Sequence, residues 1–316
     1  MSMVGEKTKK IATFMISFDT ELAWGRIATP NDGVLKILRN DPQNVRGAIK
    51  KLLQILNEND IKATWAIVGH LFLDHCESEE GIPHKSLSRP TKNWYSFDPC
   101  SDINKSPLYY GRDIIESLLS NPVKHDIGLH SFSHVLFSDC TREVANDEVK
   151  ESIRLAKKFG IDVKSFVFPQ NKIGHIDVLK ENGIQIYRGN NSLRAHPQQT
   201  FLIRKLHGFA DVIKPQLSEA IKKDGVWEIS SSGIFGEIPQ IPNGLIFRSR
   251  LAMQRAIDEN GIFHIWLHPE SLLIEPNLAE HLARFLKIVS KLRDEGKVKV
   301  MTMADLADYL DKNGTC

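Results

Sequence analysis

The sequence lacks the features that define membrane, nucleotide-binding and nucleic-acid-binding proteins. No apolar stretch approaches the roughly 18 residues that a membrane-spanning helix needs. No G-x-G-x-x-G motif follows a predicted strand, which removes the main reason to favour a dinucleotide-binding fold. The 41 Lys and Arg residues nearly balance the 39 Asp and Glu residues, and the two signs are interspersed. Since no basic stripe is present, we expect no nucleic-acid partner.

Cysteine is also scarce. Cys76, Cys100, Cys140 and Cys316 form neither a C-x-x-C spacing nor a paired framework, so we expect isolated thiols in a reducing compartment. The apolar run at 11–16 is too short for a signal peptide and does not end at a small-residue cleavage site. We therefore expect a cytoplasmic protein without a membrane span. The sequence leaves the oligomeric state open.

The remaining composition is that of a globular protein, with 41% hydrophobic and 25% charged residues. Helical patterns repeatedly end in Gly or Asn-Asp, and a short apolar run follows at once, which is typical of parallel strands buried on both faces. We expect the glycines just past these helices, Gly160, Gly183, Gly261 and Gly296, to adopt the left-handed conformation that ends a helix. Such alternation predicts a barrel or a doubly wound sheet. Predicted helices span 43–59, 142–159, 175–182, 246–260 and 277–295, and predicted strands span 11–18, 61–68, 125–130, 163–168, 184–188, 226–232, 262–267 and 297–301.

Two stretches interrupt this alternation. Residues 71–109 show little periodicity and predict a long loop rather than a second domain. Residues 189–225 allow no secure assignment of elements. We therefore expect one domain over residues 1–316, with an insertion at about 71–109 that forms a lid, a groove wall or an interface.

The strongest candidate site is the H-x-x-x-H motif of His130 and His134, directly after the apolar run HDIGLH. Histidines four residues apart lie on one face of a helical turn, so both imidazoles can bind one cation. In a parallel α/β fold, the carboxyl end of a strand faces the rim that carries the site. The motif predicts a metal site there; the alternative is two buried histidines bonded to backbone carbonyls.

Two carboxylates, Asp19 and Glu21, follow the first predicted strand. Residues two apart project to the same side of an extended chain, so both carboxylates would face one pocket. Two acids held close together shift each other's proton affinity, so that one can bind a metal ion while the other accepts a proton. The alternative is that one of them caps the next element.

A late predicted strand places His264, Trp266 and His268 on one face. His268, at the strand end, is the better candidate for a proton donor, and we expect His264 to be a core residue. Amide and aromatic side chains at the same rim are candidates for binding sugars, although a turn stabilised by its own amide is an equally good explanation of the amides. The substrate-binding candidates are Trp24, Pro169, Gln170, Asn171, Arg188 and Trp266.

These stretches occur in an order that resembles the NodB-homology polysaccharide deacetylases, carbohydrate esterase family 4. The order is a strand ending in Asp, then ATWAIVG, HDIGLHSFSH, a strand ending in Pro169 and a late strand ending in Leu-His. HDIGLHSFSH is the most specific stretch, and the resemblance spans most of the chain. It implies a distorted (β/α) barrel of seven or eight parallel strands that binds a divalent metal ion, usually zinc.

The resemblance also implies residue roles. His130 and His134 become metal ligands, Asp19 the general base and His268 the general acid. Similarity to branches with an acid-x-acid motif makes Glu21 the third ligand.

Two positions depart from the family's pattern. The second acid of its first motif is replaced here by Thr20. Its Arg-x-Pro-Tyr motif reads V-F-P-Q from Val167, so the arginine that steadies the base is missing. Arg188 or Arg26 could replace that arginine.

The combined features predict a metal-dependent hydrolase that removes an N-acetyl group from a sugar or glycan precursor. Two alternatives stay open. One is a cyclic imide or ureide amidohydrolase on the same fold, because such branches share the acid-x-acid start and the missing arginine. The other is a sugar-binding relative that has lost catalysis. The sugar, the acyl group and the metal are not specified by the sequence.

Overall fold

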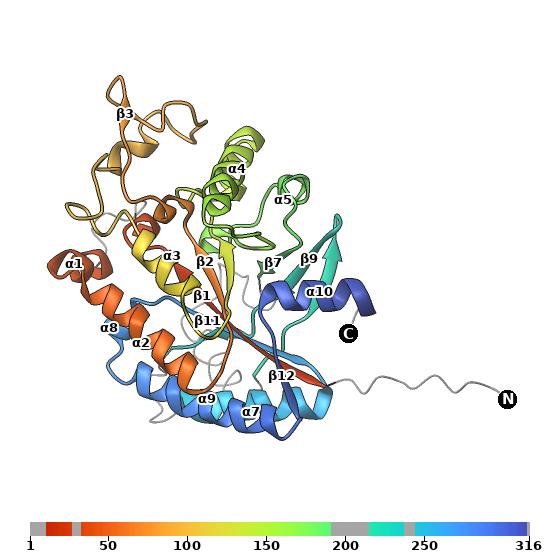
Figure 1. The fold of residues 1–316 in the computed structure, drawn as a ribbon. Coiled ribbons are helices and arrows are strands. Elements are labelled where there is room, and N and C mark those ends of the chain that lie inside the picture. Colours follow the sequence, from red (N-terminus) through yellow and green to blue (C-terminus); the bar gives the residue numbers. More distant parts are fainter. Residues whose placement is uncertain (1–10, 27–32, 191–214, 237–243, 315–316) are drawn as a thin grey trace, which may run out of the picture.

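Parallel strands form the centre of the fold (Figure 1). The computed structural model describes residues 11–26, 33–190, 215–236 and 244–314. Within them one sheet has ten strands, which are β1 (Ala12–Thr20), β2 (Thr64–Ile67), β5 (Asp126–Leu129), β6 (Ser165–Val167), β7 (Ile186–Gly189), β8 (Ala220–Lys223), β9 (Val226–Ser230), β10 (Gly233–Ile234), β11 (Ile262–Leu267) and β12 (Val298–Val300).

The strand order shows a curled sheet. It runs β10-β11-β1-β2-β5-β6-β7-β9-β8, with β12 paired to the first residues of β1. All neighbours along this order are parallel except β8 and β9. An antiparallel bridge between Ser218 and Ile262 brings the segment before β8 against β11, near the other end of the order. The sheet therefore forms the distorted (β/α) barrel that the sequence predicts.

Helices surround the sheet. In Figure 1, α2 (Asn44–Glu58), α7 (Gly244–Glu259) and α9 (Leu278–Asp294) lie along one side of it, and α4 (Arg142–Lys158) and α5 (Ile176–Glu181) lie along another. The described helices are α1 (Gly33–Asn40), α2 (Asn44–Glu58), α3 (Arg112–Leu119), α4 (Arg142–Lys158), α5 (Ile176–Glu181), α7 (Gly244–Glu259), α8 (Ser271–Ile274), α9 (Leu278–Asp294) and α10 (Met303–Asn313).

The predicted alternation of helices and strands is confirmed, because each predicted element overlaps an observed one. After α4, α5 and α9 the left-handed residue is the expected glycine, for example Gly160 with φ 72°. After α7 it is Asn260 (φ 52°), so the prediction that Gly261 supplies this conformation was wrong. Gly261 is needed for space instead, since a Cβ there would lie 2.7 Å from Leu217 Cδ1.

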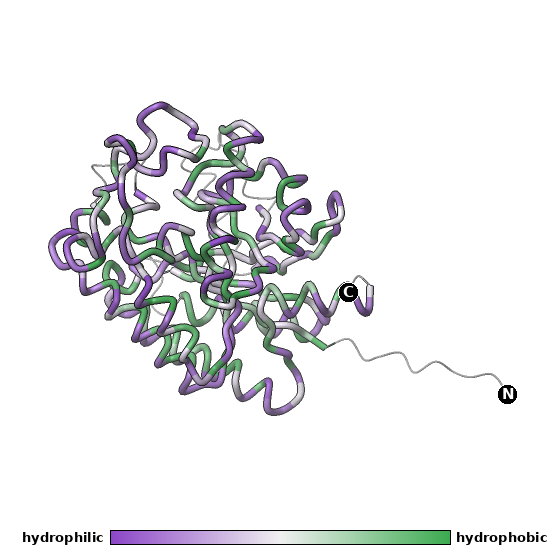
Figure 2. The backbone as a smooth tube through the Cα atoms, turned by 45° about the horizontal axis from the view of Figure 1, so that its top comes forward, coloured by the Kyte–Doolittle hydropathy of each residue, from purple (hydrophilic) through white to green (hydrophobic). Residues whose placement is uncertain are grey.

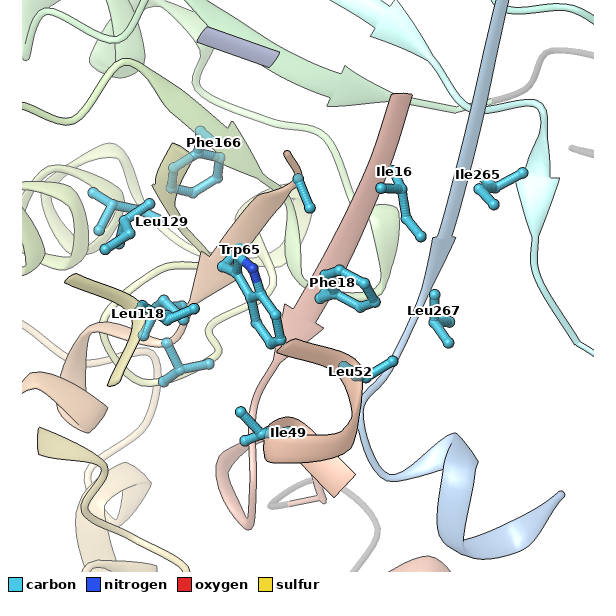
Figure 3. Packing of buried hydrophobic residues seen from close by; sticks show 14 of the residues in the cluster. Ile16, Phe18, Ile49, Leu52, Trp65, Leu118, Leu129, Phe166, Ile265 and Leu267 are labelled. Atoms are coloured by element: carbon cyan, nitrogen blue, oxygen red, sulfur yellow. The ribbon is translucent and has the colours of Figure 1, made fainter. Parts of the chain in front are cut away.

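β1 divides its side chains between two environments, and all nine of its residues are buried. Its even-numbered apolar residues face the helices, where Phe18 stacks on Trp65 with ring centroids 4.4 Å apart (Figure 3). Met15, on the opposite face, belongs to a separate apolar cluster that includes Met303 and Leu306 of α10. Toward the carboxyl end this inner face becomes polar, with Ser17 and Asp19. The barrel interior therefore has an apolar base and a polar rim.

The segment 71–109 is a long excursion after β2. It holds the short hairpin of β3 (Ser78–Glu79) and β4 (Ile82–Pro83) and a 3-10 turn at Trp94–Phe97. The hairpin stands out from the body of the molecule (Figure 1), and much of its chain is hydrophilic (Figure 2). Most of the unassigned stretch 189–225 lies outside the described residues. None of the helices in the described ranges is long and apolar enough to span a bilayer.

Candidate active site and metal centre

The H-x-x-x-H motif forms a loop in the structure, so the predicted helical turn was wrong. Ser131 (φ 57°) and His134 (φ 62°) both adopt the left-handed conformation, which is incompatible with a continuous helix. Glu148 of α4 holds this loop. Its carboxylate accepts hydrogen bonds from the backbone N–H of Phe132 at 2.8 Å and from that of Ser133 at 2.7 Å. The sequence analysis missed Glu148, because its spacing from the motif carries no signal.

The loop nevertheless brings both imidazoles to Glu21. Oε1 of Glu21 lies 3.0 Å from Nε2 of His130 and 3.2 Å from Nε2 of His134. Nε2 of His268 lies 3.4 Å from the same oxygen. Three distant stretches of chain therefore converge on one carboxylate oxygen, as the strand-end positions predicted.

The donor chemistry of this cluster fits a divalent cation. Nδ1 of His130 donates to the carbonyl of Val167 at 2.8 Å, so in the neutral ring Nε2 is a lone pair that faces the Glu21 carboxylate. Two facing acceptors need a proton or a cation between them. Burial would raise the pKa of Glu21, but the charges of His134 and His268 outweigh it and hold the pKa well below its usual range. An ionised carboxylate with two imidazoles is a common ligand set for zinc.

Asp19 is held by Arg188, a residue from the opposite side of the barrel on β7. The guanidinium donates from Nη1 to Oδ1 at 2.7 Å and from Nη2 to Oδ2 at 2.6 Å, and both side chains are almost fully buried. Burial raises the pKa of Asp19, but the charge and hydrogen bonds of Arg188 outweigh it and lower the pKa overall. Since both Asp19 oxygens are occupied, Glu21 is the better placed carboxylate for a metal ion.

This pairing shows which residue, Arg188 or Arg26, replaces the arginine that the family has at the position of Val167. Arg188 takes that place, and its prediction as a substrate-binding residue was wrong because it is 1% exposed. Arg26 pairs with the buried Glu270 at 3.0 Å. Asn171 Oδ1 accepts a hydrogen bond from Arg188 Nη2 at 3.3 Å, so its amide supports the arginine.

His268 and His264 differ as the sequence analysis expected. The His268 side chain is 22% exposed, which makes it the most open of the clustered imidazoles. Burial opposes its charged form, but the nearby carboxylates of Glu21, Glu270 and Asp19 raise its pKa to about 9. His264 is fully buried, with Nε2 3.0 Å from Ser17 Oγ, and burial together with the charge of Arg188 lowers its pKa to about 3.

The remaining candidates for substrate binding differ in exposure. Trp24 is fully buried and stacks on His70 at a centroid distance of 4.3 Å, so its ring offers no exposed face to a sugar and that prediction was wrong. Pro169 is buried as well. Gln170 is exposed, and Trp266 is half-buried, with Arg188 Cζ 4.5 Å from its ring centroid.

A cavity of about 220 Å³ lies beside the cluster. It is lined by His134, by Gln170 and by residues of the insertion that include Pro90, Thr91 and Trp94. Trp94 is half-buried, and its indole N–H donates to Ser133 Oγ at 2.8 Å. The insertion therefore forms one wall of the cavity next to a candidate metal ligand. Trp94 is not among the substrate-binding residues predicted from the sequence.

Gly25 leaves the space that the Glu21 carboxylate fills, because a Cβ at Gly25 would overlap Glu21 Oε2. We expect Gly25→Ala to displace this carboxylate and to lower activity by about 100-fold, the order of loss that a 1 Å misplacement causes. Acetate release and bound metal per chain measure both effects. Gly47→Ala is the control, since a Cβ there meets nothing within 4 Å, and it should retain full activity. Equal activity of the two variants would contradict the proposed position of Glu21.

Comparison with known proteins agrees with this geometry. The family model described as polysaccharide deacetylase matches residues 29–187, half of the 316-residue chain. No curated protein matches the sequence. Among solved structures, a protein named as a candidate polysaccharide deacetylase from Mycobacterium smegmatis is 14% identical, with a TM-score of 0.60 over 97% of this chain and 92% of that chain.

Two further structures have the same fold. An allantoinase is 11% identical, with a TM-score of 0.59 over 97% of this chain and 92% of that chain. A 4-α-glucanotransferase from Thermococcus litoralis is 14% identical, with a TM-score of 0.53 over 97% of this chain and 41% of that chain. At such identities these likenesses establish the fold alone.

Fold and site together define a class, that of metal-dependent hydrolases built on a distorted (β/α) barrel. Within this class, the chain belongs to the polysaccharide deacetylase family. The resemblance seen in HDIGLHSFSH is thus confirmed, and the chain is a carbohydrate deacetylase. The family match assigns no role to single residues, so the roles of Asp19, Glu21, His130, His134 and His268 stay predictions.

Proposed function

We propose that this protein removes the N-acetyl group from an amino sugar within a glycan or glycan precursor, with zinc as its metal ion. The observation that carries the proposal is the convergence of His130, His134 and His268 on one oxygen of Glu21, at 3.0, 3.2 and 3.4 Å. Glu21, His130 and His134 would hold the ion. When bound, it would polarise the acetyl carbonyl and make a water molecule more acidic.

Asp19 is the general base in this proposal. Its carboxylate lies next to the metal ligands, since oxygens of Asp19 and Glu21 and a nitrogen of His268 fall within 4.8 Å of one another. It accepts the proton of the attacking water. Arg188 keeps the carboxylate ionised and in a fixed orientation, which is the task of the arginine absent at Val167. Arg188 is thus a positioning residue.

His268 is the general acid. It directly follows β11, which lies on the other side of β1 from β5 in the sheet order, and it is the imidazole most accessible to a substrate. In the protonated form it donates a proton to the leaving amine nitrogen, which prevents expulsion of an unstable amide anion. The reaction thereby yields acetate and the free amine.

The cavity beside His134 is the proposed sugar site. A half-buried Trp94 ring suits the apolar face of a sugar, and the exposed Gln170 amide suits its hydroxyl groups. Pro90 and Thr91, which come from the insertion, close the same side. We propose that the chain is a single barrel domain with 71–109 as an insertion that forms the wall of this groove.

We further propose a cytoplasmic location. The support is that Cys76, Cys100 and Cys140 are free thiols, as a reducing compartment would keep them. A nucleotide sugar or a lipid-linked or short glycan precursor is then the expected substrate. The finished polymer of a cell wall is not.

The test is substrate turnover by zinc-loaded protein. We expect acetate release from N-acetylated sugar oligomers or nucleotide sugars and no ring opening of hydantoin-like substrates. Asp19→Asn should retain zinc but lose activity by about 10²–10⁴-fold, the usual contribution of a general base. Ring opening without acetate release would favour the ureide amidohydrolase. Sugar binding without turnover over a range of metals would favour an inactive relative.

A further inference from the structure

A second cluster of metal-binding side chains shares no residue with the catalytic cluster. His70 belongs to the 3-10 turn at Gly69–Phe72 that follows β2, whereas Cys76, His84 and Asp98 belong to the insertion 71–109. One donor atom from each of the four residues lies within 4.8 Å of all the others. The His70 and Asp98 side chains are fully buried, and 11% of the His84 side chain is exposed. The sequence analysis found no usable spacing for these residues.

The donor atoms face one another closely. Oδ2 of Asp98 lies 3.0 Å from Nε2 of His70, 2.8 Å from Nε2 of His84 and 3.4 Å from Sγ of Cys76. The two imidazole nitrogens are 3.1 Å apart. Four potential ligand atoms therefore surround one small volume.

The orientation of His70 leaves two acceptor groups facing each other without a proton between them. Nδ1 of His70 donates to the carbonyl of Tyr109 at 2.9 Å, so Nε2 of the neutral ring is a bare lone pair. It faces the Asp98 carboxylate, which is also an acceptor. A proton on Nε2 of His84 can be donated either to Nε2 of His70 or to the Asp98 carboxylate. In both cases the lone pair of His70 Nε2 still repels the carboxylate. A cation bound at the centre would satisfy all of them.

We propose that His70, Cys76, His84 and Asp98 bind a second divalent metal ion, of the zinc class, that fastens the insertion to the barrel. Zinc bonds of about 2.0–2.2 Å to N and O and about 2.3 Å to S place tetrahedral N···O neighbours about 3.4 Å apart and S···O neighbours about 3.6 Å apart. The observed separations are shorter than these by about 0.2–0.6 Å, so binding requires only a small outward movement of the donor atoms.

Charge also matches. Two neutral imidazoles, one thiolate and one carboxylate together neutralise a divalent ion, so the buried site would carry no net charge. The Tyr109 carbonyl that accepts from His70 fixes the ring as outer partners of metal-binding histidines do. Four protein ligands leave no open position, which is the pattern of a structural site.

The position of the cluster indicates what the ion would do. One ligand is on the barrel and three are on the insertion, so a bound ion would cross-link these two parts of the chain. Pro90, Thr91 and Trp94 lie between His84 and Asp98 in the chain and line the cavity beside His134. The second ion would therefore hold the cavity wall in place without taking part in the chemistry.

Sulfur distinguishes the two sites, because Glu21, His130 and His134 offer only N and O donors. The experiment uses the full chain, produced with zinc and a reductant and purified without chelator. Zinc per chain is measured together with zinc-edge X-ray absorption. We expect two zinc ions per chain and a sulfur shell at about 2.3 Å.

Variants assign the signals. Cys76→Ser should retain one zinc ion and lose the sulfur shell, and His84→Ala should do the same. Cys140→Ser, a half-buried thiol far from the cluster in the chain, should retain both ions and the sulfur shell. His130→Ala should lose one ion and keep the sulfur shell, so the second site is measured whether or not the deacetylase proposal holds.

The main rival is a disulfide, since Sγ of Cys76 lies 3.6 Å from Sγ of Cys100. Non-reducing peptide mapping of the native protein would reveal it. A Cys76–Cys100 disulfide, or zinc with no sulfur neighbour in the reduced protein, would overturn the second metal site. A sulfur shell that survives in Cys76→Ser would overturn it as well.

Discussion

His130→Ala is expected to remove one zinc ion per chain and to reduce acetate release to the background rate. His130 contributes one of three donors, and its Nδ1 bond to Val167 fixes the lone pair toward the shared centre. With that donor lost, Glu21 and His134 remain, and two donors hold a divalent ion weakly. Metal analysis and an acetate assay on the same preparation measure the effect.

A histidine at the other end of the same strand provides the control. His125 precedes β5 and accepts a hydrogen bond from the backbone N–H of Ala63 at 3.2 Å, away from the rim. His125→Ala should lower stability yet keep both zinc and acetate release. Full activity in His130→Ala would reject the proposed mechanism. Equal losses of zinc and activity in the two variants would show that the effect of His130→Ala comes from lower stability.

Arg188→Met is expected to impair folding stability and activity together. The substitution leaves the buried Asp19 carboxylate without its partner, and breaking a buried ion pair in this way costs about 3–5 kcal/mol. Activity should fall by about 10²–10⁴-fold, because the general base loses its orientation and its ionised form. Denaturant unfolding and acetate release measure the two losses.

A double-mutant cycle isolates the pair. Asp19→Asn alone leaves a buried guanidinium unpaired and should also destabilise the protein. The double variant Asp19→Asn with Arg188→Met buries neither charge, so its stability should recover toward that of the native chain while its activity stays low. If the two destabilisations simply add, Asp19 and Arg188 do not form the coupled pair seen in the structure.

The fold followed from the sequence to a large extent, because local rules act over short stretches. Apolar runs located eight strands of the sheet, four of them directly after helix-ending glycines, and β1 is buried throughout as such a run predicts. The exceptions are local too. Asn260 adopts the left-handed conformation expected of Gly261, which asparagine tolerates better than most other residues.

The candidate site was predicted in part. Asp19, Glu21, His130, His134 and His268 stand at strand ends, and parallel strands bring their carboxyl ends to one rim. The sequence did not predict which way every side chain points. Trp24 is a buried residue, and nothing in its sequence neighbourhood separates a buried tryptophan from one that stacks on a sugar.

The sequence by itself determined the alternation of strands and helices, the family and the strand-end acids and histidines, because each depends on residue types at short spacing. The tertiary structure alone decided which groups meet. Arg188 reaches Asp19 across the barrel from β7, Glu148 of α4 shapes the histidine loop, and the insertion brings Cys76, His84 and Asp98 to His70. These contacts join residues at separations with no fixed period, since the path of the intervening chain sets them.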